Sequence, residues 1–399
     1  MIAMSKTLRT ASAAAQSAVR ISNERAVLTQ IAVRRGVSAA ELARFLGLGP
    51  QTVGAIVADL EARGLVTRDD VVRGARGQPA RPFRLAERGA FAIGCELGWQ
   101  HCAVQLVNVR GEVIASHRLD YRFPNARTVF QKIADAVSRV LSVLTQGERV
   151  RIVGVGLTAP AAIADHIKIL GAREADAKRW AGVDVRERVE EATKLKTWLF
   201  NDGNAACWSE LALFPHPRPG TLLYLMISTA IPSAVLADGR LLEGPSNNAA
   251  DLGTTVVPRA DGTFEWLASV AGLTALMERL TKAGQVVKDG DPSLWDWEGI
   301  ESHVSEWIDV GGEAVAFAIL NAAAVVDARL AIVDGVMPRD VVHRYVESIR
   351  RHLESFPAVP AREIEIREGR TGAGGVSKGA ALLLLFRSLF SAEPDDFAG

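Results

Sequence analysis

The spacing of apolar residues in this chain of 399 residues changes at Phe91. Before that point apolar residues recur every three or four positions in segments that glycines interrupt, which is typical of short helices. After it, β-rich runs alternate with amphipathic stretches, which is typical of an α/β fold. The chain therefore divides into a small helical unit and a large α/β unit, and its length also exceeds that of one small domain.

The helical unit carries the signals of helices joined by a tight turn. A first helix is predicted over 23–35, and Ser38 and Glu41 then have the spacing of a capping box, in which each side chain accepts from the other residue's backbone amide. Pro50 follows two turn glycines, at a position where the first helical residue needs no amide hydrogen. Gly64 ends the apolar stripe of the next helix. Helix, glycine turn and helix in this order predict a helix-turn-helix.

The second helix of such a motif places its first turn in the major groove of DNA, so its outward residues are candidates for base contacts. Two β segments follow around a basic tip rich in glycine, which is typical of a wing whose arginines reach phosphates or the minor groove. The candidate DNA-binding residues are Arg44, Gln51, Thr52, Gly54, Arg73, Arg76, Gln78 and Arg81. The alternative is a helical protein-interaction module with an exposed basic hairpin.

The net charge of zero hides an uneven distribution. Residues 1–90 carry 14 Lys and Arg against 7 Asp and Glu, a net charge of +7, so the other 309 residues carry −7. A polyanionic partner, operator DNA, suits the basic part. No apolar run approaches the roughly 18 residues that cross a bilayer, so we expect a cytoplasmic protein that contacts no membrane. The three cysteines have no CxxC spacing and indicate neither a disulfide framework nor a metal site.

The large unit begins with three β-rich runs at 91–98, 101–108 and 113–119. A long amphipathic helix and a buried strand at 152–157 follow, and strands then alternate with helices toward the C-terminus. This order predicts an α/β fold with mixed sheets and flanking helices in two successive halves.

Nine short segments of the chain fall in the order and spacing of a known family. They are 22–28, 41–48, 51–53, 60–66, 77–79, 92–98, 154–160, 180–184 and 201–206. In them the chain resembles the ROK family (repressors, open reading frames and sugar kinases), in its repressor form with an N-terminal winged helix. The resemblance implies a duplicated actin-like, ribonuclease-H-like fold that binds a sugar between two lobes. It divides the chain into an N-terminal extension at 1–20, a winged helix-turn-helix at 21–88, a first lobe at 89–215 and a second lobe with a C-terminal helix at 216–399.

The phosphate-binding parts of the family's kinases are altered in this chain. Their first hairpin resembles D-x-G-G-T, whereas this chain has Glu96-Leu-Gly-Trp-Gln100. Their second loop resembles G-T-G-I-G-G-G, and here it reads Ser228-Thr-Ala-Ile-Pro-Ser-Ala234. The lost glycines restrict close backbone approach to a phosphate, and Pro232 also lacks an amide donor. The family's zinc cluster cannot form, since no cysteine follows Cys207. We therefore expect no kinase activity, no metal and no cofactor.

Four polar residues are candidates for holding a sugar: Asn201, Asp202, Asn248 and Asp251. Asp202 matches the family's general base, and without phosphate loops it is a vestigial base rather than a catalytic residue. Asp251 stands where the family has a glutamate that holds sugar hydroxyls. The alternative for Asn201 and Asp202 is a turn at the end of a strand, closed by a side-chain hydrogen bond.

The residues and the resemblance together predict a transcriptional regulator of carbohydrate metabolism genes, a repressor, that forms a homodimer or a larger homo-oligomer. A bound sugar or sugar derivative would change the angle between the lobes, and with it the spacing of two winged helices on their half-sites. Two alternatives stay open: an ATP-dependent sugar kinase that uses Asp202, and a ligand-blind platform for dimerisation and protein docking.

Overall fold

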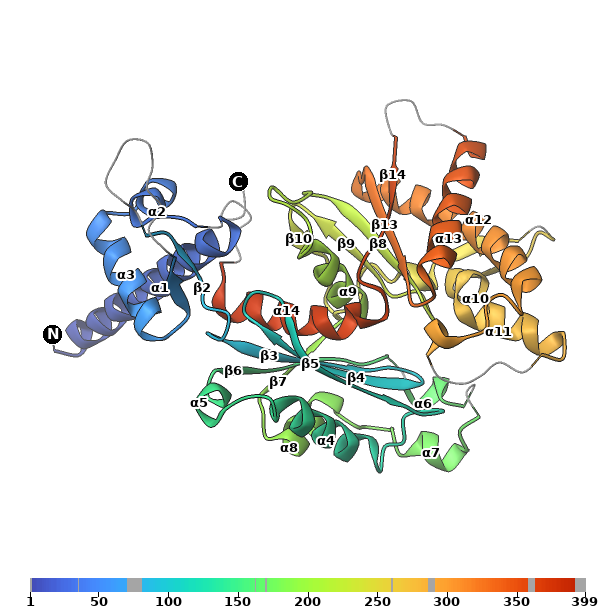
Figure 1. Ribbon diagram of the computed structural model, residues 1–399, viewed down its shortest axis with the longest axis horizontal. Helices are drawn as coiled ribbons and strands as arrows, with labels where there is room; N and C mark the ends of the chain where they lie inside the picture. Colours follow the sequence, from blue (N-terminus) through green and yellow to red (C-terminus); the bar gives the residue numbers. More distant parts are fainter. Residues whose placement is uncertain are drawn as a thin grey trace.

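The structure is a computed structural model that describes residues 2–34, 36–69, 81–161, 163–168, 171–259, 261–285, 291–357 and 363–391. Side chains are described from residue 17 onward, apart from those of residues 165 and 166. Figure 1 shows a small helical unit at one end of the molecule and two larger lobes beside it.

Three helices and a two-stranded sheet make up the N-terminal unit. They are α1 (Ile2–Val33), α2 (Ala39–Leu46), α3 (Pro50–Ala62), β1 (Val66–Arg68) and β2 (Phe83–Leu85). Helix α1 begins at Ile2, whereas the sequence predicts a first helix that starts near residue 23. The residues predicted as an extension at 1–20 contain no Pro or Gly and are rich in Ala, so nothing in them ends a helix.

The predicted helix-turn-helix is confirmed, and its turn signals work as expected. Ser38 Oγ accepts a hydrogen bond from the Glu41 amide, and the Glu41 carboxylate accepts one of 2.8 Å from the Ser38 amide. Gly47 ends α2 with φ 62°, a left-handed conformation that favours glycine. The apolar stripe of the motif is buried and consists of Leu42, Val53, Val57 and Leu60.

The two strands of the predicted wing pair antiparallel, with Val66 opposite Leu85 and Arg68 opposite Phe83. The isolated bridge from Val37 to Phe83 ties the wing to the start of the helix-turn-helix. The tip of the wing, with Arg73, Arg76 and Gln78, lies outside the described residues.

The first lobe is a five-stranded mixed sheet. Its strands are β3 (Phe91–Leu97), β4 (His101–Asn108), β5 (Val113–Asp120), β6 (Ile152–Thr158) and β7 (Thr197–Phe200), in the order β5-β4-β3-β6-β7. The first three pair antiparallel, and β6 and β7 extend the sheet in parallel. The helices between its strands are α4 (Val129–Leu141), α5 (Gln146–Arg149), α6 (Ile163–His166), α7 (Glu174–Lys178) and α8 (Val185–Thr193). Helices α4 and α8 cover one face (Figure 1).

The second lobe repeats this plan in a sheet of order β10-β9-β8-β13-β14. The strands are β8 (Leu222–Ile227), β9 (Ser233–Ala237), β10 (Arg240–Leu241), β13 (Leu330–Gly335) and β14 (Glu365–Glu368). Again three antiparallel strands are followed by two parallel ones. The same strand order in two successive halves is the duplicated actin-like arrangement that the sequence predicts.

Further elements complete the second lobe. They are the hairpin β11 (Val256–Pro258) and β12 (Phe264–Trp266), the helices α10 (Leu267–Ala271), α11 (Leu273–Lys282), α12 (Glu301–Val326) and α13 (Arg339–Ser355), and the 3₁₀ turns η1 (Leu252–Thr254), η2 (Pro292–Leu294) and η3 (Gly372–Gly374). Helix α12 is long and apolar enough to cross a membrane, so the expectation that no segment approaches this length is wrong. Half of its apolar window is buried within the protein, where it packs against α10 and α13. Helices in the core of a protein can be equally long and apolar.

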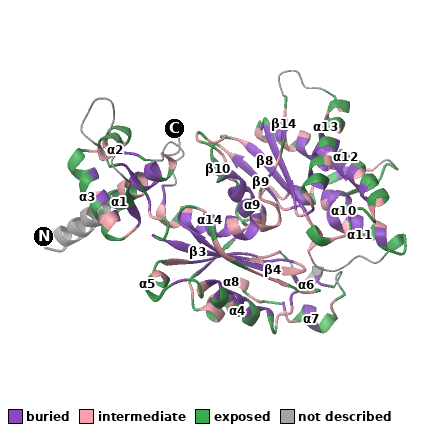
Figure 2. Cartoon of the chain, in the orientation of Figure 1, coloured by how far each residue is buried: buried purple, intermediate pink, exposed green. Residues whose placement is uncertain are grey.

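Two helices join the lobes. Helix α9 (Asp202–Leu211) follows the last strand of the first lobe, and α14 (Gly375–Leu389) follows the last strand of the second. Although α14 is predicted as part of the second lobe, it packs on the free face of the first-lobe sheet and on α9 (Figure 2). Glycines make this contact possible: a Cβ on Gly94 would lie 1.7 Å from the Ser377 carbonyl oxygen, and one on Gly379 would lie 1.7 Å from that of Ala205.

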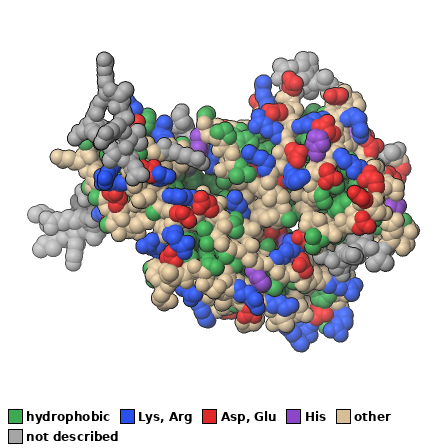
Figure 3. Space-filling view, in the orientation of Figure 1, with side chains coloured by type: hydrophobic (Ala, Val, Ile, Leu, Met, Phe, Trp, Pro, Cys, Tyr) green, Lys and Arg blue, Asp and Glu red, His purple; other side chains and the backbone are tan. Residues whose placement is uncertain are grey.

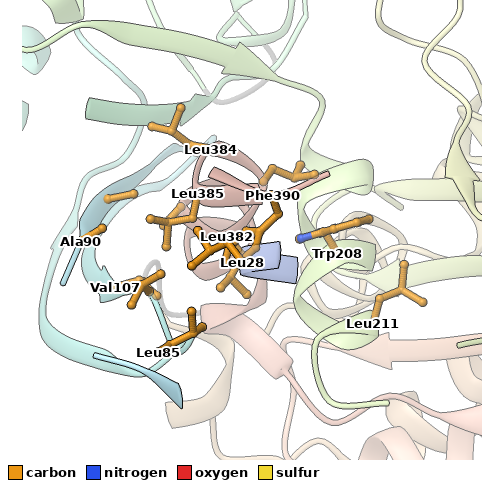
Figure 4. Close-up of a cluster of buried hydrophobic side chains, with 14 of the residues drawn as sticks. Leu28, Leu85, Ala90, Val107, Trp208, Leu211, Leu382, Leu384, Leu385 and Phe390 are labelled. Atoms are coloured by element: carbon orange, nitrogen blue, oxygen red, sulfur yellow. The ribbon is translucent and has the colours of Figure 1, made fainter. Parts of the chain in front are cut away.

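The far end of α14 reaches the winged helix. Figure 4 shows Leu382, Leu385 and Phe390 gathered around Leu28 of α1. The amide of Ser391 donates to Thr29 Oγ1 at 2.9 Å, and the guanidinium of Arg25 donates to the Ser388 carbonyl at 3.2 Å. One continuous apolar core therefore runs from the N-terminal unit through α14 to the lobes.

Candidate functional site

A cleft opens between the two lobes, at the carboxyl ends of the central strands. The first lobe contributes the turn after β3 with Trp99, and the second contributes the loop after β8 with Ser228 and Pro232. Asp202 and Val376, the first residues of α9 and α14 that face it, line its floor. The cleft holds about 80 Å³, whereas ligand pockets are typically about 300–1,000 Å³. The cleft is therefore narrower in this structure than a typical ligand pocket.

The first altered hairpin is tightly closed. The Gly98 amide donates to the His101 carbonyl at 2.8 Å, and the Tyr121 hydroxyl donates to the Gly98 carbonyl at 2.9 Å. A Cβ on Gly98 would lie 2.8 Å from the His101 ring. The Trp99 indole lines the cleft and packs partly against the first-lobe core. The hairpin therefore presents an indole to the cleft.

The backbone groups of the loop at 228–234 form hydrogen bonds within the loop and with α11. The Ser228 amide donates to the Ala230 carbonyl at 3.0 Å, and the Ser228 carbonyl accepts from the Leu273 amide at the start of α11 at 2.7 Å. The Thr229 carbonyl accepts from the Thr274 hydroxyl at 2.7 Å. Pro232 contributes no amide hydrogen. The loop is thus held against the start of α11.

The glycine-rich turn at 369–375 binds a carboxylate of the protein itself. The buried Asp334 carboxylate at the end of β13 accepts from the amides of Thr371 at 3.0 Å and Gly372 at 2.8 Å. It also accepts from the Arg339 guanidinium at 2.8 Å. The backbone amides of this turn therefore bind an internal carboxylate.

The predicted sugar-binding residues gather beside the cleft. Asn201 Nδ2 donates to Asn248 Oδ1 at 3.2 Å, and Asn248 Nδ2 donates to Asp251 Oδ2 at 3.3 Å. Asn201 is also the N-cap of α9, and its Oδ1 accepts from the Asn204 amide at 2.9 Å. The turn that the sequence leaves open as an alternative is therefore present, and it also joins Asn201 to the polar cluster. Asp202 follows directly and lines the cleft.

The carboxylate of Asp202 lies in an unusual electrostatic environment. Burial, together with the charges of Glu96 and Asp251, raises the pKa of Asp202 to about 6, against an ordinary value of 3.8. The Gly203 amide, which donates to Asp202 Oδ1 at 2.8 Å, opposes this shift. A carboxyl group with this pKa can donate a hydrogen bond to a sugar hydroxyl as well as accept one.

A charge pair that the sequence does not predict lies across the cleft. Arg118 at the end of β5 lies 3.8 Å from Asp291, the N-cap of η2 in the second lobe. Burial alone would raise the pKa of Asp291, but hydrogen bonds from Ser293 and the charge of Arg118 hold it below its ordinary value. On the first-lobe side, His101 Nε2 lies 3.1 Å from the Glu96 carboxylate. Charges of both signs are also interspersed over the lobes (Figure 3).

Among the described residues, no three His, Cys, Asp or Glu side chains gather in an arrangement that suits a metal ion. The sequence expects neither a metal nor a cofactor.

The predicted DNA-contacting residues of the helix-turn-helix lie on one exposed side. Gln51, Thr52 and Gly54 are exposed in the first turn and a half of α3, while Val53 between them is buried. A Cβ on Gly54 would meet no atom within 4 Å, so a neighbouring backbone can approach there. Arg44 at the end of α2 and Arg81 at the edge of the wing are exposed as well.

The base of the wing is electrically balanced. Arg68 forms a two-point ion pair with Glu61, with distances of 2.7 and 2.8 Å, and Arg84 pairs with Asp69. Arg44 is therefore a better candidate for phosphate contact than either of these two arginines.

Residues 92–386 match the model of the ROK family. The chain belongs to the ROK family. Residues 22–77 match a model of the MarR family, which covers the helix-turn-helix and the start of the wing. The two matches correspond to the two units that the change of pattern at Phe91 separates.

Two of three relatives of this ROK chain match it over more than nine-tenths of its length. A protein of Sinorhizobium fredii designated y4fQ is 26% identical over 373 residues, 92% of each chain. The xylose repressor of Bacillus spizizenii is 22% identical over 242 residues, which are 60% of this chain and 61% of that protein. A solved ROK family transcriptional regulator, described as a homologue of the E. coli MLC protein, is 18% identical with a TM-score of 0.67, covering 95% of this chain and 97% of that one. The winged helix and the duplicated lobes thus occur together in a known fold.

Proposed function

We propose that this ROK family protein is a sugar-responsive transcriptional regulator that represses carbohydrate metabolism genes in the cytoplasm. One observation carries the proposal: helix α14 connects the interlobe cleft, through Val376, to the winged helix, through Phe390. A ligand that separates the lobes moves the start of this helix, and the apolar contact with Leu28 passes the movement to α1. The xylose repressor and the ROK family transcriptional regulator among the similar proteins support this proposal.

Two copies of the chain are needed for such a mechanism, so we include a homodimer in the proposal. Paired winged helices read half-sites about one helical turn of DNA, or a multiple, apart. A change of lobe angle in each copy alters the separation of Gln51 and Thr52 from their counterparts in the other. Operator affinity then depends on whether that separation still matches the half-sites.

The experiment is a binding titration on DNA from upstream of the gene, with competitor DNA at physiological salt. We expect specific binding that one sugar in a panel of pentoses, hexoses and N-acetylhexosamines weakens at least five-fold. Asp202→Asn and Asn248→Ala should lose the sugar response and keep DNA binding. Arg127→Ala, at an exposed position of the first lobe, is the matched control. Failure to bind upstream DNA above competitor would reject the proposal.

A sugar kinase is the second candidate, because Asp202 lies in the cleft with a pKa near neutrality. The closed hairpin at Trp99, the loop built against α11 and the internal carboxylate of Asp334 argue against it, since phosphoryl transfer depends on positioning the phosphates. An ADP-release assay over the same sugar panel distinguishes a kinase from a regulator without kinase activity. We expect no turnover above background, and sugar-dependent turnover that Asp202→Asn abolishes would establish the kinase instead.

A further inference from the structure

Two polar side chains on the first-lobe side of the interlobe cleft contain buried atoms that lack a hydrogen bond. Glu96 in β3 and Thr158 at the end of β6 are opposite each other in the parallel register of the two strands, and both line the cleft. Thr158 is 1% exposed, and its Oγ1 has no hydrogen-bond partner among the described residues. Glu96 Oε2 has none there either, whereas Oε1 lies 3.1 Å from His101 Nε2. Because buried polar atoms are normally paired, these two atoms point to a ligand.

Both side chains point to the side of the sheet that carries α14. Side chains alternate between the two faces of a strand, and Gly94 and Gly156 precede Glu96 and Thr158 by two residues. A Cβ on either glycine would lie within 2.2 Å of a backbone carbonyl oxygen of α14. Glu96 and Thr158 therefore face this side too, where Asp202 also lines the cleft.

The carboxylates of Glu96 and Asp202 repel each other. The negative charge of Glu96 contributes to the raised pKa of Asp202, so the two groups lie close together. Arg118 is the arginine that lines the cleft, but it lies 2.9 Å from Asp120 and 3.8 Å from Asp291 and so serves other carboxylates. A cation between Glu96 and Asp202 would replace their repulsion by two attractions.

The cation that suits these groups is a primary ammonium. Such a group has three hydrogen-bond donors, and Glu96 Oε2, Thr158 Oγ1 and the Asp202 carboxylate supply three acceptors. Hydrogen bonds between an ammonium and a carboxylate are charge-assisted and strong. A divalent metal ion needs a fuller set of oxygen ligands. Among the described residues, no three acidic, His or Cys side chains are arranged to provide one.

We propose that the effector bound in the cleft is an amino sugar with a free amine. Its ammonium group donates to Glu96, Thr158 and Asp202, and its hydroxyls face the amide of Asn248 and the carboxylate of Asp251. The assignment rests on the proposed function and names the ligand class of the same site. The charged amine is then preferred over a hydroxyl or an acetamide at the same position of the sugar ring.

The test is isothermal titration calorimetry of the full chain at pH 7 with D-glucosamine, D-galactosamine and D-mannosamine. Each is paired with its parent hexose and with its N-acetyl form. We expect at least one amino sugar to bind at least about ten-fold more tightly than both of its neutral partners, the effect of one hydrogen bond to a charged group. Binding of no amino sugar, or affinity for the amine no higher than for the neutral forms, would overturn the proposal.

Two conservative variants locate the ammonium group. Glu96→Gln removes the charge and keeps the shape, so it should abolish the preference for the amine over the neutral forms. Thr158→Val removes one acceptor and should weaken the amino sugar at least about three-fold. Glu191→Gln is the matched control, because that side chain is 61% exposed on α8, and it should bind as the unaltered chain does.

Unfolding curves establish that each variant is folded, and Thr158→Val serves if Glu96→Gln is not. An undiminished preference for the amine in the folded variants would overturn the proposal. The calorimetry needs no DNA, so an operator titration with the same ligands separates this inference from the proposed function. Release of the operator by a neutral sugar and by no amino sugar would reject the inference alone. Tight binding of the amine to a chain that binds no operator would reject the regulator alone.

Discussion

The amide of Ser391 donates a hydrogen bond of 2.9 Å to the hydroxyl of Thr29, beside the apolar contact of Phe390 with α1. Through this pair the segment after α14 is fixed to the helix that carries the helix-turn-helix. The winged helix is therefore held in place by contacts between residues near opposite ends of the described chain.

Phe390→Ala tests this connection. Removing a buried phenylalanine costs about 3–5 kcal/mol, and here the cost falls on the contact between the winged helix and the lobes. We expect urea unfolding to separate into two transitions, with the sugar response of DNA binding reduced. Phe264→Ala, at a phenylalanine that is 71% exposed, should change stability by less than about 0.5 kcal/mol. A single unshifted transition in the Phe390 variant would show that the contact carries little energy.

Asp291→Asn tests the charge pair across the cleft. The pair with Arg118 is partly exposed and should contribute about 0.2–1 kcal/mol, so its loss shifts the lobes toward open forms by up to about five-fold. Small-angle scattering should report a larger radius of gyration. Asp120→Asn removes the other carboxylate near Arg118, at 2.9 Å, without crossing the cleft, and is the control. Equal scattering from the two variants would contradict this role.

Asp202 makes stability depend on pH. Its folded pKa of about 6 lies above the ordinary 3.8, so the folded protein holds this proton more tightly than the unfolded chain. The ionised carboxylate of Asp202 therefore destabilises the folded protein. This effect is complete above pH 6 and disappears as the pH falls toward 4. Asp202→Asn should stabilise the protein by about 1–3 kcal/mol at pH 8 and much less at pH 4. Urea unfolding at the two pH values checks this, and an equal gain at both would refute it.

Asp334→Ala should be the most damaging of the single polar substitutions. It leaves two backbone amides and the Arg339 guanidinium without their carboxylate, at an expected cost of about 3–5 kcal/mol. Thermal unfolding measures the loss. Asp340→Ala, at an exposed position in the first turn of α13, should cost less than about 1 kcal/mol. Similar losses in both variants would mean that the turn does not depend on Asp334.

Gln51 and Arg44 should affect DNA binding differently. Gln51→Ala removes a side chain that can read a base edge, so we expect a loss of about 1–3 kcal/mol on the operator and little on competitor DNA. Arg44→Ala should weaken binding to both DNAs and lower the salt dependence by about one counterion. Anisotropy titrations at several salt concentrations distinguish these effects. The assignment of roles fails if the Gln51 variant loses affinity for all DNA equally.

Local signals in the sequence predicted the local structure well. The capping box at Ser38, the left-handed Gly47 and the first-turn Pro50 are fixed by backbone chemistry within four residues, so the helix-turn-helix could be placed correctly. The start of α1 was harder, because an Ala-rich segment without glycine or proline contains no boundary signal.

The sequence could not supply the contacts between distant segments. Arg118 and Asp291 belong to different lobes, and their proximity depends on the angle at which the lobes pack. The carboxylate that the turn at 369–375 binds, that of Asp334, comes from a neighbouring strand. A cavity of about 790 Å³ where the winged helix meets the lobes is likewise formed by five separate segments. Such features arise from packing rather than from local propensity.

The late position of α14 in the sequence also determines when its contacts can form during synthesis. This helix leaves the ribosome after every other element that it touches, yet it covers one face of the first-lobe sheet and the apolar side of α1. Until it emerges, those surfaces stay open to chaperones and to other chains. The DNA-binding unit can form early, but it is held at a defined angle to the lobes once translation has passed Phe390. Incomplete chains would therefore carry a formed winged helix without the fixed geometry that two half-sites require.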